Sequence, residues 1–328
     1  MQPDGQKPDT ITGRSCGIPR SEKGAAGGSM ETRQPSPVTE RLFRLVVLDI
    51  DGTLLDPSDV VRPVVRAAIA ECRQLGIPVA LATGRRLCAT RPVLAELGLP
   101  LPLVLVNGAL VWDAEREEAL VERPLDRHAL ARTLAEAERE GLGALALRGL
   151  ASGERLVLVT DPLPALPEFE QELLPRSGAV DRLPAAAVIE LPDVLTLDLF
   201  GPERALRRAT ARLARAGLPI YHHGPFEWIP ALPRWVANVH APGVSKASGV
   251  DILARRLGLT LEDVLAVGDG ENDLPLLRRA GLGVAMGNAP DYVRAQADAV
   301  VRGHDEDGVA EALERFVLEP WRRARALA

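Results

Sequence analysis

The chain has 328 residues, of which 46% are hydrophobic, 26% are charged and 3% are aromatic. This balance excludes an intrinsically disordered or collagen-like protein, and the length favours about two domains. The formal net charge of −6 argues against a dedicated nucleic-acid-binding protein, so we expect no nucleic-acid partner. No uninterrupted apolar run of about 18 residues occurs, so we also expect no membrane-spanning helix.

Residues 1–40 are rich in proline, glycine, serine and charged residues, which predicts a disordered tail. No apolar stretch in the tail resembles the core of a signal peptide, and Met30 offers an alternative start of translation. The three cysteines, Cys16, Cys72 and Cys88, are odd in number and lack zinc-site spacing. They favour a reducing, cytoplasmic location, and we expect Cys72 and Cys88 to be buried in helices.

Three apolar runs alternate with two helical patterns after this tail. The predicted strands and helices follow in the order 44–48, 59–75, 77–82, 86–97 and 103–106. This alternation of strand and helix is typical of a parallel α/β sheet with helices on both faces. Each predicted strand ends in polar or glycine-containing residues, and open α/β sheets bind ligands at these carboxyl ends.

The middle of the chain has a different pattern, in which prolines separate acidic helices from short strand-like segments. Helices are predicted at 126–140 and 203–216, and strands at 155–160 and 194–200. We expect residues 113–240 to form a second α+β domain, inserted into a core made of residues 41–112 and 241–328. The α/β pattern then resumes, with segments at 246–257, 264–267, 274–280, 283–286 and 307–317.

Two carboxylates, Asp49 and Asp51, follow the first predicted strand and precede Gly52 and Thr53. Residues two apart on a strand project to the same side, and such close like charges raise a pKa unless a cation compensates. The arrangement suits a nucleophile with an acid/base partner, or a Mg²⁺ site of oxygen ligands. A simple aspartate turn is the alternative, but the second aspartate and the threonine favour the chemical interpretation.

Two further polar motifs follow predicted strands. Thr83-Gly84-Arg85 precedes a helix, where a hydroxyl and free N–H groups can bind an anion, although an ordinary helix N-cap explains the same residues. Residues 268–273 read Gly-Asp-Gly-Glu-Asn-Asp. An EF-hand is excluded because the later glutamate and the flanking helices are absent. We therefore prefer a metal site that combines Asp269 with the first pair of aspartates over a plain acidic turn.

Lys246 is the only lysine after the tail, because the other two, Lys7 and Lys23, lie within residues 1–40. An acidic pocket with a nucleophilic aspartate needs positive charge to keep that aspartate ionised. A compact ammonium can fit where a guanidinium cannot. A surface position is the alternative for any lysine, but arginine fills the other basic positions of the globular region.

These motifs, in this order, resemble those of the haloacid dehalogenase superfamily of phosphotransferases. The matching segments are Asp49–Leu55, Ala82–Arg85, Gly243–Ala247 and Gly268–Asp273. The insertion between the second and third motifs resembles the type IIB cap of Cof-type phosphatases. The resemblance covers residues 44–317 and implies a Rossmann-like core with a cap domain. It also implies Mg²⁺-dependent hydrolysis of a small phosphorylated metabolite, such as a sugar phosphate or a phosphorylated cofactor.

The resemblance further implies a role for each motif residue. Asp49 would attack the substrate phosphorus, form an aspartyl-phosphate and ligate Mg²⁺. Asp51 would act as acid and base and bind the metal through its backbone carbonyl, and Asp269 would be the further ligand. Asp273 would orient Lys246 or a metal-bound water. The phosphoryl group would be held by the backbone N–H groups of Ile50 and Gly84 and by the side chains of Thr83, Lys246 and Asn272.

Other patterns have simpler interpretations. The aromatic and histidine residues between Tyr221 and Trp235 are expected to pack within the insertion, with substrate specificity as the alternative. His128, His240 and His304 fit no pattern and are expected at the surface. Five arginines recur on the helix at 203–216, and we expect a solvated face rather than a nucleic-acid groove. They are Arg204, Arg207, Arg208, Arg212 and Arg215.

Two other functions remain alternatives to a phosphatase. A phosphomutase on the same scaffold would use the same pair of aspartates. A non-catalytic α/β ligand-binding module is the alternative from another class, although intact acids at positions 49, 51 and 269 argue against it. A dinucleotide-dependent oxidoreductase is disfavoured because no GxGxxG follows the first strand.

Overall fold

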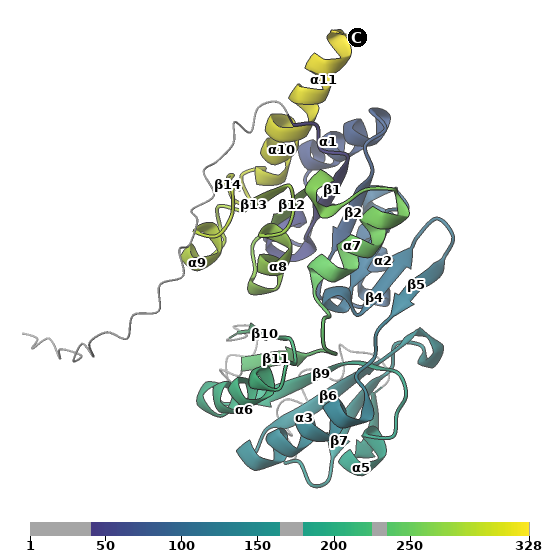
Figure 1. Cartoon of the computed structure of the whole chain (residues 1–328), viewed down its shortest axis with the longest axis vertical. Helices are drawn as coiled ribbons and strands as arrows, with labels where there is room; N and C mark the ends of the chain where they lie inside the picture. Colours follow the sequence, from purple (N-terminus) through teal and green to yellow (C-terminus); the bar gives the residue numbers. More distant parts are fainter. Residues whose placement is uncertain (1–40, 165–179, 225–234, 328) are drawn as a thin grey trace, which may run out of the picture. The chain divides into compact units, whose positions relative to one another are not determined.

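The computed structural model describes residues 41–164, 180–224 and 235–327, which form two β-sheets with helices packed against them (Figure 1). The first sheet has the strand order β14-β13-β12-β1-β2-β3-β4-β5. Its strands in chain order are β1 (Leu45–Leu48), β2 (Val79–Ala82), β3 (Leu103–Leu105), β4 (Leu110–Asp113), β5 (Glu118–Glu122), β12 (Val264–Gly268), β13 (Leu282–Ala285) and β14 (Ala299–Val300).

The predicted parallel α/β core is confirmed in this first sheet. Neighbouring strands from β14 to β3 run parallel, whereas β4 and β5 extend the sheet as antiparallel strands. The core helices are α1 (Pro63–Gln74), α2 (Leu87–Leu97), α7 (Lys246–Arg256), α8 (Leu274–Leu277), α9 (Asp291–Arg294), α10 (Gly308–Leu313) and α11 (Glu319–Ala326). The chain leaves this sheet only after Glu122, whereas the sequence pattern predicts that the insertion starts at residue 113.

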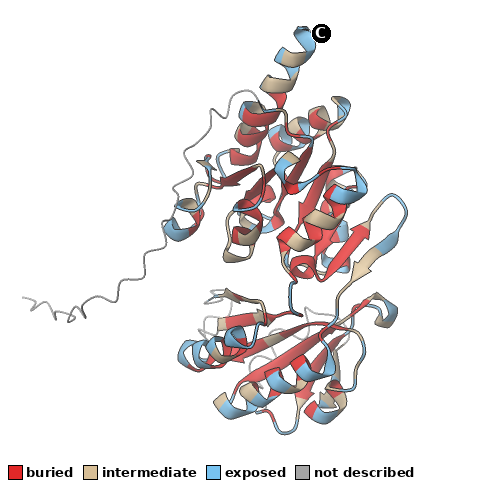
Figure 2. Cartoon of the chain, in the orientation of Figure 1, coloured by how far each residue is buried: buried red, intermediate tan, exposed pale blue. Residues whose placement is uncertain are grey.

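Alternation along β1 explains why both faces of the first sheet are covered. Val46 and Leu48 belong to an apolar cluster that also contains side chains of α1, α2 and α10. Leu45 and Val47 project to the opposite face and join a cluster with α7, α8 and α9. Strand β1 is therefore buried on both sides, as its continuous apolar run predicts (Figure 2).

The second sheet has the order β10-β11-β9-β6-β7-β8, and one of its faces packs on three helices. Its strands are β6 (Gly143–Arg148), β7 (Leu156–Thr160), β8 (Val180–Pro184), β9 (Val194–Gly201), β10 (Ile220–His223) and β11 (Trp235–Val239). Its helices are α3 (Arg127–Glu140), α5 (Ala185–Val188) and α6 (Glu203–Arg215). In the part of the chain that is described, no helix is long and apolar enough to cross a membrane.

The predictions for two cysteines and for the arginines of α6 can be compared with the structure. Cys72 is buried in α1 as expected, but the expectation for Cys88 is wrong, because this residue is exposed on the first turn of α2. Two of the five arginines of α6 make ion pairs with α3: Arg208 bonds Glu140, and Arg212 bonds both Glu136 and Glu140. These arginines therefore join α6 to α3.

Gly108 is required where β3 leads into the loop beneath α7. Its φ is +98°, and a Cβ atom there would lie 2.1 Å from the carbonyl oxygen of Ser245, the residue that caps α7. We expect Gly108→Ala to lower the free energy of unfolding by about 3 kcal/mol, since left-handed backbone strain and overpacking add. Gly258→Ala is the matched control: its φ is +68°, but no described atom lies within 4 Å. Chemical denaturation should show a loss of only about 1 kcal/mol for the control, and equal losses would contradict this explanation.

Candidate active site

Asp49 lies where β1 ends, at the centre of the first sheet. Leu48 pairs with Val267 of β12, and the backbone N–H of Asp49 donates to the carbonyl of Val267 at 3.0 Å. This register brings Asp49 beside Asp269, which follows β12 directly. The Asp49 residue is only 5% exposed. The carboxyl ends of two parallel strands therefore bring together acids that are 220 residues apart in the sequence.

Lys246 lies between two carboxylates. It is the first residue of α7, is 0% exposed, and its Nζ donates to Asp49 Oδ1 at 2.6 Å and to Asp273 Oδ1 at 2.7 Å. Burial alone would lower the pKa of the ammonium, but Asp273 and Asp49 outweigh burial and raise it. Lys246 therefore carries a positive charge inside the site. A surface position for this lysine is excluded.

The glycine-rich loop after β12 is held by its own last aspartate. Asp273 Oδ2 accepts the backbone N–H groups of Asp269 (3.1 Å) and Gly270 (2.9 Å). Asp269 Oδ1 in turn accepts the Thr53 hydroxyl at 3.1 Å. Gly52 completes the contact: its φ is +71°, and a Cβ atom would lie 2.3 Å from Asp269 Oδ2. The turn after β1 and the loop after β12 thus pack directly against each other.

Three carboxylates of this site can approach one cation. Oxygen atoms of Asp49, Asp269 and Asp273 lie within 4.8 Å of one another. Burial raises the pKa of Asp49 well above its usual range, although Lys246 opposes the rise, and burial together with Asp273 raises the pKa of Asp269 to about 6. Three acids against one ammonium leave an excess of negative charge, which a divalent cation with oxygen ligands would neutralise. The residues present therefore fit a Mg²⁺ ion.

Asp51 lies outside this cluster. The expectation that Asp49 and Asp51 share a strand face is wrong, because β1 ends at Leu48 and Asp51 belongs to the turn that follows it. The Asp51 side chain is 58% exposed, and its Oδ2 accepts Arg85 Nε at 2.9 Å. The two aspartates thus have different environments: one is buried beside an ammonium, and the other is open and paired with a guanidinium.

The predicted anion-binding residues lie on neighbouring loops. Thr83 is buried, and its Oγ1 accepts the backbone N–H of Arg85 at 3.1 Å, so its hydroxyl hydrogen can be donated to an anion. Gly84 lies against Asn107, because a Cβ atom on Gly84 would be 3.3 Å from Asn107 Oδ1. Asn272 donates to the same Oδ1 at 2.9 Å. Ile50 is fully buried within the turn after β1.

Asn107 and His240 were not among the predicted site residues. Asn107 has a φ of +53° and joins Asn272 to His240, whose Nε2 lies 3.2 Å from Asn107 Nδ2. The surface expectation for His240 is wrong: it is fully buried, and burial lowers its pKa to about 4. Neutral His240 therefore accepts from the amide. The position of Asn107 after a strand could have signalled its role, whereas no sequence pattern marks His240.

The second sheet carries a polar face near the site. Asp198 Oδ1 accepts Asn238 Nδ2 at 2.6 Å and Thr196 Oγ1 at 3.1 Å, and burial raises the pKa of Asp198 to about 6. Burial lowers the pKa of His223, and nearby Lys246 lowers it further. Burial raises the pKa of Tyr221 to about 12, against an opposing effect of Lys246. Tyr221 and His223 of β10 therefore lie within electrostatic reach of the site. Residues 225–234 of the predicted aromatic segment lie outside the described residues.

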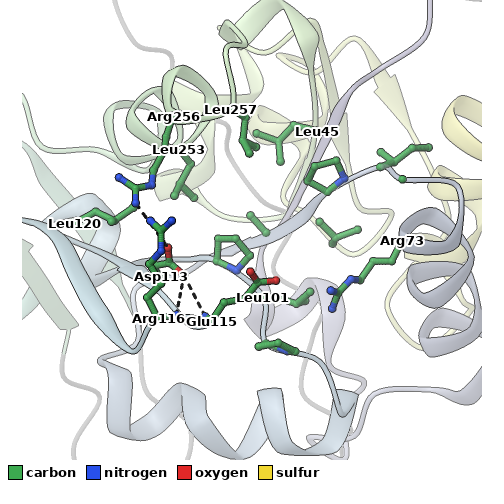
Figure 3. Close-up of a pocket in the computed structure, with 17 residues that line it drawn as sticks. Leu45, Arg73, Leu101, Asp113, Glu115, Arg116, Leu120, Leu253, Arg256 and Leu257 are labelled. Carbon is green, nitrogen blue, oxygen red and sulfur yellow. Dashed lines mark hydrogen bonds and ion pairs between the residues drawn. The ribbon is translucent and has the colours of Figure 1, made fainter.

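A separate pocket lies at the opposite ends of the strands. It has a volume of about 490 Å³ and is lined by apolar residues such as Leu45 and Leu101, with charged Arg73, Asp113 and Arg116 around them (Figure 3). Leu45 begins β1, whereas Asp49 follows its end. None of the predicted site residues lines this pocket. The acidic site and the pocket are therefore distinct.

Comparisons with known proteins show the family of the chain. A model of the haloacid dehalogenase-like hydrolase family matches residues 46–161 and 230–313. The chain belongs to this family. A solved sugar phosphatase of subclass IIB of the superfamily has a TM-score of 0.69 at 22% identity and covers 83% of this chain and 98% of its own, which shows a shared fold. The unit built on the second sheet is inserted into the core, and we refer to it as the cap.

Two curated relatives are phosphatases named for different substrates. A 5-amino-6-(5-phospho-D-ribitylamino)uracil phosphatase of Bacillus subtilis is 30% identical over 84% of this chain and 96% of its own length. A phosphoglycolate phosphatase of Methanopyrus kandleri is 30% identical over 84% of this chain and 97% of its own. The chain is therefore a haloacid dehalogenase phosphatase that hydrolyses a phosphomonoester.

Proposed function

We propose that the protein hydrolyses a sugar phosphate or a phosphorylated cofactor with Mg²⁺ through an aspartyl-phosphate on Asp49. The observation that carries this proposal is the contact of buried Asp49 with Lys246, beside the acids Asp269 and Asp273. Asp49 Oδ1 is engaged by the ammonium, which leaves Oδ2 to attack phosphorus. As this oxygen bonds to phosphorus, the bond from phosphorus to the leaving oxygen breaks, and Asp51 supplies the proton that the leaving oxygen takes up.

The second half of the reaction regenerates Asp49. A water molecule attacks the phosphorus, Asp51 accepts its proton, and the bond between phosphorus and Asp49 breaks to release inorganic phosphate. The open position of Asp51 beside Arg85 suits a group that exchanges protons with the leaving group and with water. Thr83, Asn272 and the backbone N–H groups of Ile50 and Gly84 would hold the phosphoryl oxygens.

The ligands that we propose for Mg²⁺ are Asp49, Asp269 and the backbone carbonyl of Asp51. When bound, the ion supplies positive charge that compensates the acids and the phosphoryl oxygens. Asp273 belongs to the same acidic cluster, but its two oxygens already accept three donors. We therefore assign Asp273 to positioning Lys246. The free thiols of Cys72 and Cys88 fit the cytoplasm that we propose as the compartment.

The polar face of the cap supports a hydroxyl-bearing leaving group. Among the described residues, both hydrogen bonds to Asp198 go to Oδ1, so Oδ2 is available to accept from a substrate. His223 and Tyr221 add hydrogen-bonding groups on β10, which is separated from β9 by β11. A hydroxyl-bearing chain or sugar would satisfy such a set, whereas an unsubstituted alkyl group would leave these polar groups unpaired.

The test measures release of inorganic phosphate from a panel of phosphorylated sugars, polyols and cofactors. We expect turnover that needs Mg²⁺ and stops when a chelator removes it. The preferred substrate should lose about tenfold in kcat/KM in Asp198→Asn, since a hydrogen bond to a charged group is weakened. p-Nitrophenyl phosphate should be affected little, because it lacks hydroxyl groups. Transfer of phosphate between positions of one sugar without release would instead indicate the phosphomutase, and absence of Mg²⁺ binding would favour a non-catalytic module.

A further inference from the structure

Glu154 of the cap contacts the first turn of α2 in the core. It lies in the loop between β6 and β7, is 6% exposed, and its two carboxylate oxygens accept the backbone N–H groups of Leu87 (2.6 Å) and Cys88 (2.8 Å). The Arg86 guanidinium donates to the backbone carbonyl of Glu154 at 3.1 Å. These three hydrogen bonds join residues more than 60 positions apart in the sequence.

Helix α2 needs an acceptor at this end. The first N–H groups of a helix have no partner within the helix, and a side chain usually accepts them. The N-cap residue of α2 is Arg86, whose side chain provides no cap hydrogen bond. Glu154 supplies the missing acceptor from the other unit, and its negative charge is favourable at a helix N-terminus. The contact also lies next to Thr83-Gly84-Arg85, the loop that we assign to phosphate binding.

The backbone at Glu154 adopts a conformation that favours glycine, although the residue is a glutamate. Its φ is +52°, in the left-handed region that favours glycine.

A second contact lies at another edge of the cap, where the backbone N–H of His222 in β10 donates to Glu271 at 3.1 Å. Asp49 is buried, so a substrate must displace part of its cover to reach it. These two hydrogen-bonded contacts join the cap to the core, beside apolar residues of both parts that share one cluster.

We propose that Glu154 is a positioning residue that latches the cap onto α2, so that closure of the cap orders the phosphate-binding loop. The inference rests on the proposed phosphatase function. When the cap opens, α2 loses its acceptor, and when the cap closes, the three hydrogen bonds re-form. Closure and the capping of α2, the helix that follows the phosphate-binding loop, are then a single event. A residue that only capped α2 would stabilise the helix without holding the distant β10 contact.

Hydrogen–deuterium exchange of the full chain separates these two roles without using turnover. In Glu154→Ala, we expect the backbone amides of β10, including that of His222, to exchange about tenfold faster than in the wild type, because loss of charged hydrogen bonds favours the open cap. Glu203→Ala is the matched control, since Glu203 pairs only with Arg207 within α6 among the described residues. Faster exchange limited to the start of α2 would overturn the latch.

A kinetic experiment tests the same point by giving helix α2 a new N-cap residue. Arg86→Ser gives α2 an N-cap hydroxyl of its own, so the double variant Glu154→Ala/Arg86→Ser restores the helix cap but not the connection to the second sheet. We expect this variant to recover thermal stability while its kcat/KM remains about tenfold below that of Arg86→Ser. Recovery of both would overturn the latch. Absence of phosphate release by the wild type would instead contradict the proposed function, and the exchange result would still decide on the latch.

Discussion

Asp49→Asn is expected to abolish turnover of p-nitrophenyl phosphate in the presence of Mg²⁺, with a loss of about 10⁴-fold or more in kcat. A carboxamide has nearly the same shape as the carboxylate, but its oxygen is a far weaker nucleophile. Lys246 would keep one charged partner, because Asp273 accepts its other hydrogen bond at 2.7 Å. The variant should therefore remain folded, and its loss of activity would reflect chemistry.

The control for this experiment is Asp251→Asn. Asp251 pairs with Arg255 on the outer part of α7, in an ion pair one turn apart. Removing this pair should leave kcat within about twofold of the wild type, since exposed pairs contribute little. Phosphate release and thermal unfolding are measured for both variants. Full activity in Asp49→Asn would contradict the mechanism.

The sequence predicts the first sheet well because its strands are buried on both faces. Continuous apolar runs such as Leu45–Leu48 leave no competing amphipathic pattern, and the polar residues after them mark the carboxyl ends. Strand β5 is missed because it has an exposed-to-intermediate pattern at the sheet edge. Local pattern cannot show that Glu118–Glu122 adds to the first sheet, since that depends on pairing with β4.

The candidate site is predictable in part for the same reason. Asp49, Asp269 and Lys246 lie in short motifs, and parallel strand topology alone brings their loops together. The direction of each side chain is not encoded in the motif. Asp51 turns to Arg85 because β1 ends at Leu48, three residues before Asp51. Glu154 illustrates the remaining limit. It reaches Leu87 only through packing of the cap, and its own neighbours in the sequence predict nothing about that contact.

Lys246→Arg is expected to lower kcat by about 100-fold or more, although the formal charge is kept. The Lys246 side chain is fully buried, and one compact ammonium donates to Asp49 and Asp273 at 2.6 and 2.7 Å. A guanidinium is larger and planar, and its donors diverge in a fixed fork. It would displace at least one carboxylate from the acidic cluster or shift the first turn of α7.

The companion variant Lys246→Met separates shape from charge. It leaves Asp49, Asp269 and Asp273 without an ammonium, so the buried acids repel one another and the pKa of Asp49, already raised by burial, rises further. We expect this variant to lose activity and also to unfold at a lower temperature at neutral pH, with partial recovery of stability as pH falls and the acids take up protons. Lys246→Arg should show no such recovery because it retains a cation. An arginine variant with wild-type kcat would show that charge alone suffices, and the single lysine of the globular region would then have no chemical explanation.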